Sequence, residues 1–192
     1  TLDGDLSDTA WHNALTVDNF IDVQGDSKSL RQVKAQLIKK DGTLYIAAQI
    51  EAPEGLTKTG YEGRDNSRAP RNDHFRVHLA VGDSTHTFLV TARGTELDAR
   101  GNNSVEGRKW NSEFKSATAP TNDGWQMEMA IPLKDLDING QTLRINLVRR
   151  DVTANTECEL SPTFGRSGLD HRVPMYQSDW RGVERFALLE LD

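Results

Sequence analysis

Two histidines come closest to a recognisable chemical pattern in this sequence. His74 and His78, in NDHFRVHL, have the four-residue spacing at which a helix presents two imidazoles on one face to bind zinc. The apolar residues Phe75, Val77 and Leu79 alternate with polar ones here, which predicts a strand instead. On a strand the two Cα atoms lie about 13 Å apart, too far for both imidazoles to share one zinc ion easily. We therefore expect polar histidines on the outer face of a strand.

Nucleophilic and acid–base catalysis have no stronger support. The sequence has no Gly-x-Ser-x-Gly turn, and its single cysteine, Cys158, lies in no recognisable catalytic context. Glu157 and Glu159 share a strand face by spacing, but solvated surface charge explains them more simply than a catalytic pair. We predict no catalytic residues.

Tryptophans in polar surroundings suggest a different chemistry. An exposed aromatic ring flanked by hydrogen-bonding side chains suits a sugar, whose C–H face stacks on the ring while its hydroxyls bond to the rim. Trp110, in RKWNSEF, and Trp180, in YQSDWRGVERF, have this context. The alternative for each is a partly buried tryptophan that closes one end of the fold. The candidate sugar contacts in these surroundings are Trp110, Trp180, Tyr61, Tyr176 and Gln177.

The elements that must position these side chains are strands. QVKAQLIKKDGTLYIAAQIE alternates on both sides of Asp41-Gly42, and HFRVHLAVGDSTHTFLVTA alternates on both sides of Gly82-Asp83-Ser84, so we predict two hairpins. GWQMEMAIPL, TLRINLVRRDV and VERFALLELD predict further strands, whereas only PLKDLDING favours a short helical turn. We predict an all-β, jelly-roll-like antiparallel sandwich that forms a single domain over residues 1–192.

Two long polar segments and one acidic segment remain. Residues 52–72 and 92–113 predict loops of about 20 residues, a length that is usually functional or disordered. DGDLSD at residues 3–8 has part of the spacing of a calcium loop but lacks its downstream glutamate. It is equally a turn entering the first strand, with Trp11 in the core. Trp125 also sits on an apolar face, so packing is its expected role.

Composition excludes several classes of protein. A formal charge of −6 argues against a nucleic-acid partner, and no segment approaches the ~20 apolar residues of a membrane span. A single cysteine allows no disulfide within the chain. The start TLDGDLSD has neither an initiator Met nor a signal peptide, as expected for a processed chain or an excised domain.

The order of these segments resembles a known family. DGDLSDTAW, DGTLYIAAQIEAP, NDHFRVHL, GWQMEMAIPLKDL, LRINLVRRDV, ELSP and RFALLEL together are similar to the family 9 carbohydrate-binding modules, over nearly the whole chain. The resemblance implies a β-sandwich with structural calcium. It also implies a noncatalytic, extracellular or periplasmic domain that binds a polysaccharide or oligosaccharide beside the catalytic domain of a carbohydrate-active enzyme.

The best-known members of that family clamp the end of a glucan or xylan between two tryptophans. Trp180 matches the place of one of them. The other belongs just before Asn72-Asp73, where this chain has SRAPR, and Arg76 stands where an acid is typical. Asp73 shares the parity of the buried strand residues, so it either anchors the loop or helps to hold calcium.

The departures from the family pattern favour an acidic ligand. Arg64, Arg68 and Arg71 offer forked donors suited to carboxylate or sulfate groups. A uronate-rich or sulfated polysaccharide is therefore the sharper hypothesis.

Two other classes stay open. A haem-binding redox subunit of the same superfamily would need axial ligands from Met127, Met129, Met175 or a histidine, although the strand period places Met127 and Met129 on the core face. A purely architectural domain would instead show an exposed apolar patch.

Overall fold

The computed structural model describes residues 1–22, 31–53, 63–101, 107–138, 142–160 and 186–189. The strands are β1 (Leu15–Val17), β2 (Ile21–Asp22), β3 (Val33–Lys40), β4 (Thr43–Glu51), β5 (His74–Val81), β6 (Ser84–Thr91), β7 (Glu96–Arg100), β8 (Lys115–Thr121), β9 (Gly124–Pro132), β10 (Leu143–Asp151), β11 (Thr156–Glu159) and β12 (Ala187–Leu189). Short 3-10 helices are η1 (Thr9–Asn13), η3 (Ala69–Arg71), η4 (Gly107–Lys109) and η5 (Leu133–Leu136). None of these described helices has the length or hydrophobicity to span a bilayer.

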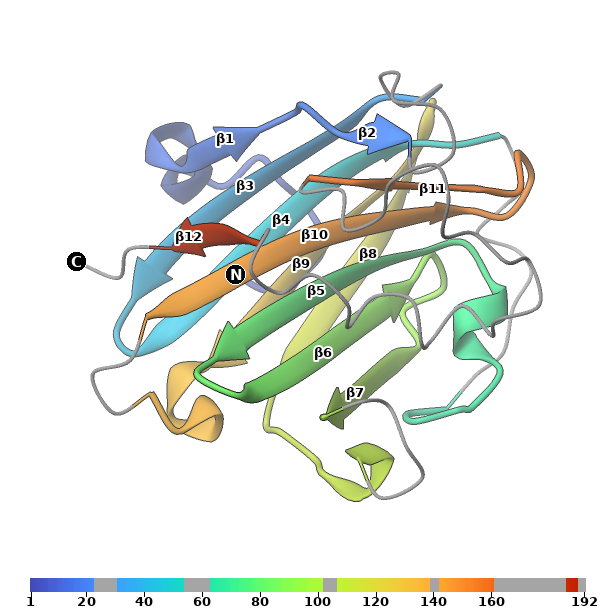
Figure 1. Cartoon of the computed structure of the whole chain (residues 1–192). Coiled ribbons are helices and arrows are strands. Elements are labelled where there is room, and N and C mark those ends of the chain that lie inside the picture. Colours follow the sequence, from blue (N-terminus) through green and yellow to red (C-terminus); the bar gives the residue numbers. More distant parts are fainter. Residues whose placement is uncertain (23–30, 54–62, 102–106, 139–141, 161–185, 190–192) are drawn as a thin grey trace.

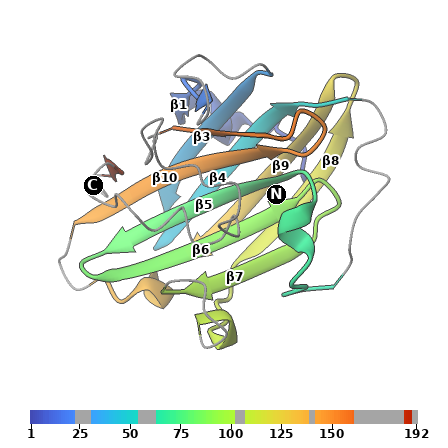
Figure 2. The same cartoon turned by 45° about the vertical axis from the view of Figure 1, so that its right-hand side comes forward.

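Two antiparallel sheets pack face to face, which confirms the predicted all-β sandwich (Figure 1). One sheet has the strand order β1-β3-β4-β9-β8. The other has the order β2-β11-β10-β5-β6-β7, with β12 also paired to β10. Figure 2 shows β10, β5, β6 and β7 side by side in front of the five-stranded sheet.

Both predicted hairpins form. Asp41 and Gly42 have φ angles of 50° and 73° in the turn between β3 and β4, and two positive φ angles match the twist of the flanking strands. Gly82 has a φ of 54° in the turn between β5 and β6. Pro132 ends β9, and the short helical turn predicted in the next residues is η5.

One predicted loop contains a strand. Within residues 92–113, β7 pairs with β6. The prediction is wrong here because β7 turns charged residues inward: Asp98 pairs with Phe88, a core residue, and so faces the interior of the sandwich. Period-two patterning of apolar residues does not detect such a strand.

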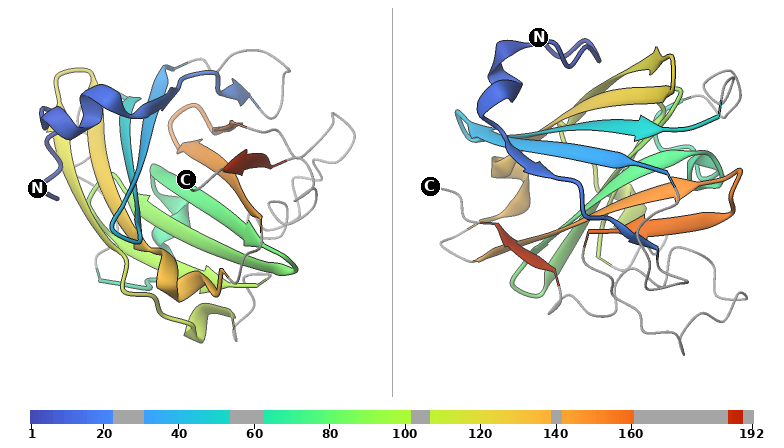
Figure 3. Two further views of the ribbon diagram at one scale, coloured as in Figure 1. Left: turned by 90° about the vertical axis from the view of Figure 1, so that its left-hand side faces the viewer. Right: turned by 90° about the horizontal axis from the view of Figure 1, so that it is seen from above.

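The core lies between the sheets and includes Trp125, as predicted. Phe88 and Phe114 meet edge to face at 5.2 Å within it. Trp11 is buried elsewhere, which corrects its expected place in the core. Helix η1, which carries Trp11, lies against the outer face of the five-stranded sheet (Figure 3, left). The Trp11 indole N–H donates there to Glu128 Oε1 at 3.1 Å.

Glu128 anchors the whole N-terminal segment. Its Oε2 accepts hydrogen bonds from the main-chain N–H groups of Asp3 and Gly4, each at 2.9 Å. Gly4 has a φ of 84°, and a Cβ there would come within 2.9 Å of the Thr118 main chain. The DG of DGDLSD therefore serves a close main-chain approach to β8.

Candidate functional site

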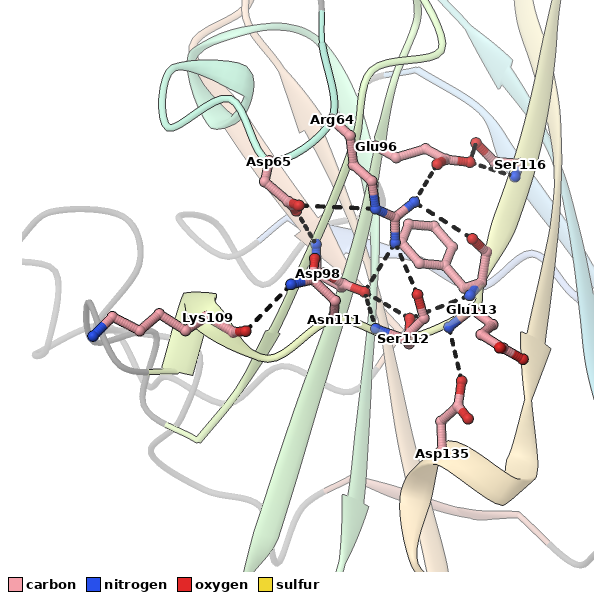
Figure 4. Close-up of polar contacts among 11 residues, drawn as sticks. Arg64, Asp65, Glu96, Asp98, Lys109, Asn111, Ser112, Glu113, Ser116 and Asp135 are labelled. Carbon is pink, nitrogen blue, oxygen red and sulfur yellow. Dashed lines mark hydrogen bonds and ion pairs between the residues drawn. The ribbon is translucent and has the colours of Figure 1, made fainter.

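The first candidate, Arg64, is held inside a network of carboxylates (Figure 4). Its guanidinium donates to Asp98 Oδ2 at 3.0 Å and to Glu96, and its Nε lies 3.8 Å from Asp65 Oδ2. It also stacks 4.7 Å above the Phe114 ring. Three carboxylates already surround this cation, so the structure gives Arg64 a role different from the predicted capture of an acidic sugar.

The same network joins the edges of the two sheets. Glu96 on β7 accepts from the Ser116 N–H at 2.6 Å and from its hydroxyl at 2.9 Å, and Ser116 lies on β8. Asp98 Oδ2 accepts from the Ser112 N–H and hydroxyl at 2.7 and 2.6 Å. The inward-facing acids on β7 therefore link the edge strand of one sheet to the edge strand of the other by hydrogen bonds.

Asp65 and Asp98 form the part of this network that fits a cation. Asp98 is fully buried, and its Oδ1 has no hydrogen-bond partner among the described residues. Asp65 Oδ1 accepts from the Asp98 N–H at 3.3 Å, and burial raises the pKa of Asp65, with the Asp98 carboxylate adding to the shift. A calcium ion would neutralise both groups. No group of three or more His, Cys, Asp or Glu residues gathers at a metal site in the part of the chain that the structure describes.

Asp73, the predicted calcium ligand, has other partners. Its Oδ1 accepts from the Trp125 indole at 3.1 Å, and its Oδ2 from Arg149 Nη2 at 3.0 Å. Burial raises the pKa of Asp73 to about 6, against the opposing effect of Arg149. Both carboxylate oxygens of Asp73 already accept hydrogen bonds, so these contacts fit a loop anchor better than a calcium ligand.

The histidines of β5 lie on the predicted outer face but are buried. His78 is 2 % exposed because Thr87 and Phe186 cover it: its Nδ1 lies 3.0 Å from Thr87 Oγ1, and its ring centroid lies 6.2 Å from that of Phe186. His74 is fully buried, with Nδ1 2.8 Å from the Asn72 carbonyl. The alternation thus identifies the correct face but not its burial.

A polar cluster, which the sequence reasoning missed, surrounds these histidines on β5, β10 and β11. Arg76 donates to Glu157 at 3.1 Å, and Asn146 donates to Glu159 at 3.0 Å. The expectation that Glu157 and Glu159 are solvated charges is wrong, since Glu159 is buried and Glu157 pairs with a buried arginine. A sequence signal existed: six outward positions of β5 and β10 carry Arg, His or Asn.

The two remaining arginines lie at the edge of this face. Arg71 ends η3, Arg68 precedes it, and both side chains are exposed. The loop turns directly into β5, because the Asn72 N–H donates to the Ala69 carbonyl at 3.0 Å. Arg68 and Arg71 therefore lie beside the start of β5, whose outward residues belong to the polar cluster.

Trp110 packs against the end of the core, so most of its ring contacts other side chains rather than forming a surface on which a sugar could stack. Its half-buried ring packs at 6.0 Å from Phe88 and at 5.0 Å from His86. This is the alternative in which the tryptophan closes one end of the sandwich. Met127 and Met129 are fully buried between the sheets, as packing residues. The exposed large hydrophobic side chains of the described residues, Leu15, Val152 and Leu188, lie on separate elements.

His86 makes stability depend on pH. It is fully buried, and neither ring nitrogen has a hydrogen-bond partner among the described residues. Burial, aided by Arg100, lowers the pKa of His86 from 6.5 to about 4. The unfolded chain therefore binds this proton first, so we expect folding stability to fall by on the order of 3 kcal/mol between pH 6.5 and 4.

Urea titrations of the wild type and of His86→Leu at pH 7, 5 and 4 measure this loss. The variant lacks the titrating group, so its free energy of unfolding should fall less. Equal losses in both proteins would contradict the assignment to His86.

The other candidates, Tyr61, Tyr176, Gln177 and Trp180, lie outside the described residues, as does Met175. Their predicted roles stay predictions. Of the sugar-contact candidates in the described residues, Arg68 and Arg71 are exposed and lie in one turn, where the Arg71 N–H donates to the Arg68 carbonyl at 2.9 Å. Arg64 and Trp110 are held in internal contacts.

Comparisons with known proteins agree with this architecture. Carbohydrate-binding modules of family 9 from Caldicellulosiruptor kristjanssonii, solved with glucose and with cellotriose, match with TM-scores of 0.67 and 0.64 at 17% and 18% identity. Both matches cover 100% of this chain and 91% and 89% of those chains, respectively. A putative carbohydrate-binding protein from Bacteroides uniformis matches with a TM-score of 0.67 at 14% identity, covering 94% of this chain and 88% of that one.

Sequence comparison assigns the family. The chain is 25% identical over 137 residues to endo-1,4-beta-xylanase C of Paenibacillus barcinonensis, a match that covers 71% of this chain and only 12% of that enzyme. The family model described as carbohydrate family 9 binding domain-like matches residues 2–159 of the 192. This chain therefore belongs to the carbohydrate family 9 binding domain-like family.

Proposed function

We propose that this carbohydrate-binding module is noncatalytic and binds an oligosaccharide on the outer face of its seven-stranded sheet. The observation that carries the proposal is the match of the whole chain to modules solved with glucose and with cellotriose, joined to the family match. The exposed guanidinium groups of Arg68 and Arg71 at the edge of this face support the location, since they can donate to the hydroxyls of a sugar. Trp180 would supply the stacking ring.

An acidic sugar is the finer proposal. Arg68 and Arg71 are exposed where β5 begins, and a guanidinium binds a carboxylate through two parallel hydrogen bonds. Arg64 has no part in this, because Glu96 and Asp98 hold it.

The double variant Arg68→Gln/Arg71→Gln tests the acidic ligand by calorimetry. We expect it to bind a glucuronate-bearing xylooligosaccharide about tenfold more weakly, a loss of ~1.4 kcal/mol, and the neutral oligosaccharide unchanged. The wild type should lose the same preference in high salt. Lys39→Gln/Lys40→Gln removes two charges from exposed residues of β3 and serves as the control. An unchanged affinity of the arginine variant for the glucuronate-bearing sugar, together with no salt effect in the wild type, would exclude the acidic ligand.

Calcium is proposed at Asp65 and Asp98. Their side chains and nearby main-chain carbonyls would hold the ion, which would supply structural charge neutralisation. At calcium concentrations about 100 times the dissociation constant, linkage predicts a rise in melting temperature of roughly 5–10 °C relative to EDTA.

The shift should disappear in Asp65→Asn and in Asp98→Asn but persist in Asp83→Asn, a surface control. The measured quantity is the calcium-induced shift, so a lower starting stability of Asp98→Asn does not obscure it. An unchanged shift in both site variants, or no shift in the wild type, would remove this site.

A further proposal concerns the setting of the domain. We propose that it accompanies a catalytic domain for polysaccharide degradation outside the cytoplasm, supported by its similarity to a segment of a xylanase. A chain expressed alone should therefore bind xylan or cellulose in a pull-down and release no reducing sugar from either.

A further inference from the structure

A polar groove lies on the five-stranded sheet, away from the polar cluster. It has a volume of about 670 Å³ and opens to solvent beside the β8–β9 turn. Ligand sites of proteins usually have volumes in this range. The hydrogen-bonding residues that line it are Arg31, Gln32, Lys34, Gln49, Thr121 and Asn122, with the acids Glu51 and Asp123.

Strand register explains why the groove is open. Across the outer face of this sheet, Gln36, Ala47 and Glu128 form one row of neighbours, and the N-terminal segment covers that row through Trp11. The adjacent row of Lys34, Gln49 and Gln126 is not covered in this way, and Lys34 and Gln49 are exposed.

The groove walls are held in place by contacts behind them. Arg31 donates to Asp151 and to Thr153 Oγ1, the latter at 2.7 Å. Glu51 Oε2 accepts from the Gln32 N–H at 2.9 Å, and the Ala52 N–H donates to the Asp123 carbonyl at 2.9 Å. The loops on both sides of the groove are thus tied to strands before any ligand arrives, which lowers the ordering cost of binding.

The lining specifies the chemistry of the occupant. Two cations and two acids balance, so the groove has no net formal charge among its described residues. Gln32, Gln49 and Asn122 each present a donor and an acceptor together, which match neighbouring hydroxyls that both donate and accept. The described lining has no aromatic ring, so binding here would depend on hydrogen bonds rather than stacking.

We propose that this groove is a second glycan-binding site, which takes a short neutral oligosaccharide through hydrogen bonds to Lys34, Gln49 and Asn122. The inference rests on the proposed function of the domain but concerns the opposite sheet. Two sites on one module would let it hold two chains, or two parts of one chain, of an insoluble polysaccharide, and the second contact raises the overall affinity.

Calorimetry with xylohexaose on four proteins tests the groove. The proteins are the wild type, Trp180→Ala, the groove variant Lys34→Ala/Gln49→Ala, and the combination of all three substitutions. The groove variant replaces exposed strand side chains, and Lys39→Ala/Lys40→Ala on the same strand is its matched control. Trp180→Ala should retain weak binding of xylohexaose. The affinity of the combined variant should be at least tenfold lower than that of Trp180→Ala, whereas the control substitutions should leave the affinity unchanged. Side-chain amide signals of Gln49 and Asn122 should shift in NMR titrations of Trp180→Ala.

Other outcomes overturn the groove. If Trp180→Ala loses all binding and the groove variant binds like the wild type, the second site does not exist but the proposed function stands. If the wild type binds neither xylohexaose nor cellohexaose, both proposals fail together. If the residual binding of Trp180→Ala survives in the combined variant, a site elsewhere is responsible.

Discussion

Replacing Arg149 with Met is expected to lower the free energy of unfolding by about 3–5 kcal/mol, the usual cost of breaking a buried ion pair. Arg149 is 1% exposed, and its Nη2 lies 3.0 Å from Asp73 Oδ2 and 3.7 Å from Asp151 Oδ2. It also donates to the Glu51 carbonyl at 3.3 Å. The substitution removes one cation from three oxygen partners and leaves the buried Asp73 carboxylate with neutral donors, the Trp125 indole and the Val152 main chain.

Urea denaturation measures the effect, with Arg150→Met as the control. Arg150 is the next residue on β10, but it points to the outer face and pairs with Asn155 in an exposed contact. Its loss should cost less than about 1 kcal/mol. The double variant Arg149→Met/Asp73→Asn should recover part of the stability, because it leaves no unpaired charge. A loss below about 1 kcal/mol for Arg149→Met would contradict the assigned anchor.

Glu128→Ala should cost about 3–4 kcal/mol and release the N-terminal segment. The carboxylate is 2% exposed and accepts hydrogen bonds from the main-chain N–H groups of Asp3 and Gly4 and from the Trp11 indole. Hydrogen bonds to a charged group contribute about 1.5–3 kcal/mol each, and fraying of the chain end limits the total. Glu128→Gln keeps one carbonyl oxygen and should cost roughly half as much.

Release of the N-terminal segment can be measured separately from the free energy of unfolding. Amide hydrogen exchange at Asp3 and Gly4 should accelerate in Glu128→Ala under conditions where the core stays protected, and tryptophan emission should shift to the red. Glu113→Ala removes an exposed carboxylate paired with Lys134 and should change neither quantity. Unchanged exchange at Gly4 would mean that Glu128 does not hold the segment.

Local patterns were sufficient for much of the fold. The hairpins at Asp41-Gly42 and at Gly82 follow from alternation and turn chemistry, since both act between neighbours in the chain. The sequence did not predict strand β7, because Asp98 faces inward. An inward carboxylate is stable there because it pairs with Arg64, a contact that depends on the folded structure. Glu128 is a comparable case, because its partners lie more than 110 positions away in sequence.

The candidate site was less predictable for the same reason. Alternation places His74 and His78 on the outer face, but burial depends on side chains such as Phe186 that arrive from distant parts of the chain. Arg64 and Arg71 look alike in the sequence, yet carboxylates on β7 surround Arg64, whereas Arg71 is exposed. Side-chain type therefore indicates the chemistry available, and only the fold decides which groups are free to use it.

The most direct test of the central claim is the affinity of the wild type and of Trp180→Ala for cellohexaose and xylohexaose by calorimetry. We expect measurable binding by the wild type and a loss of at least tenfold, ~1.4 kcal/mol, in Trp180→Ala. Trp110→Phe should bind like the wild type, because the Trp110 ring packs on Phe88 and His86. A folded Trp180→Ala protein with unchanged affinity would contradict binding through Trp180, and a wild type that binds neither sugar would contradict carbohydrate binding by this domain.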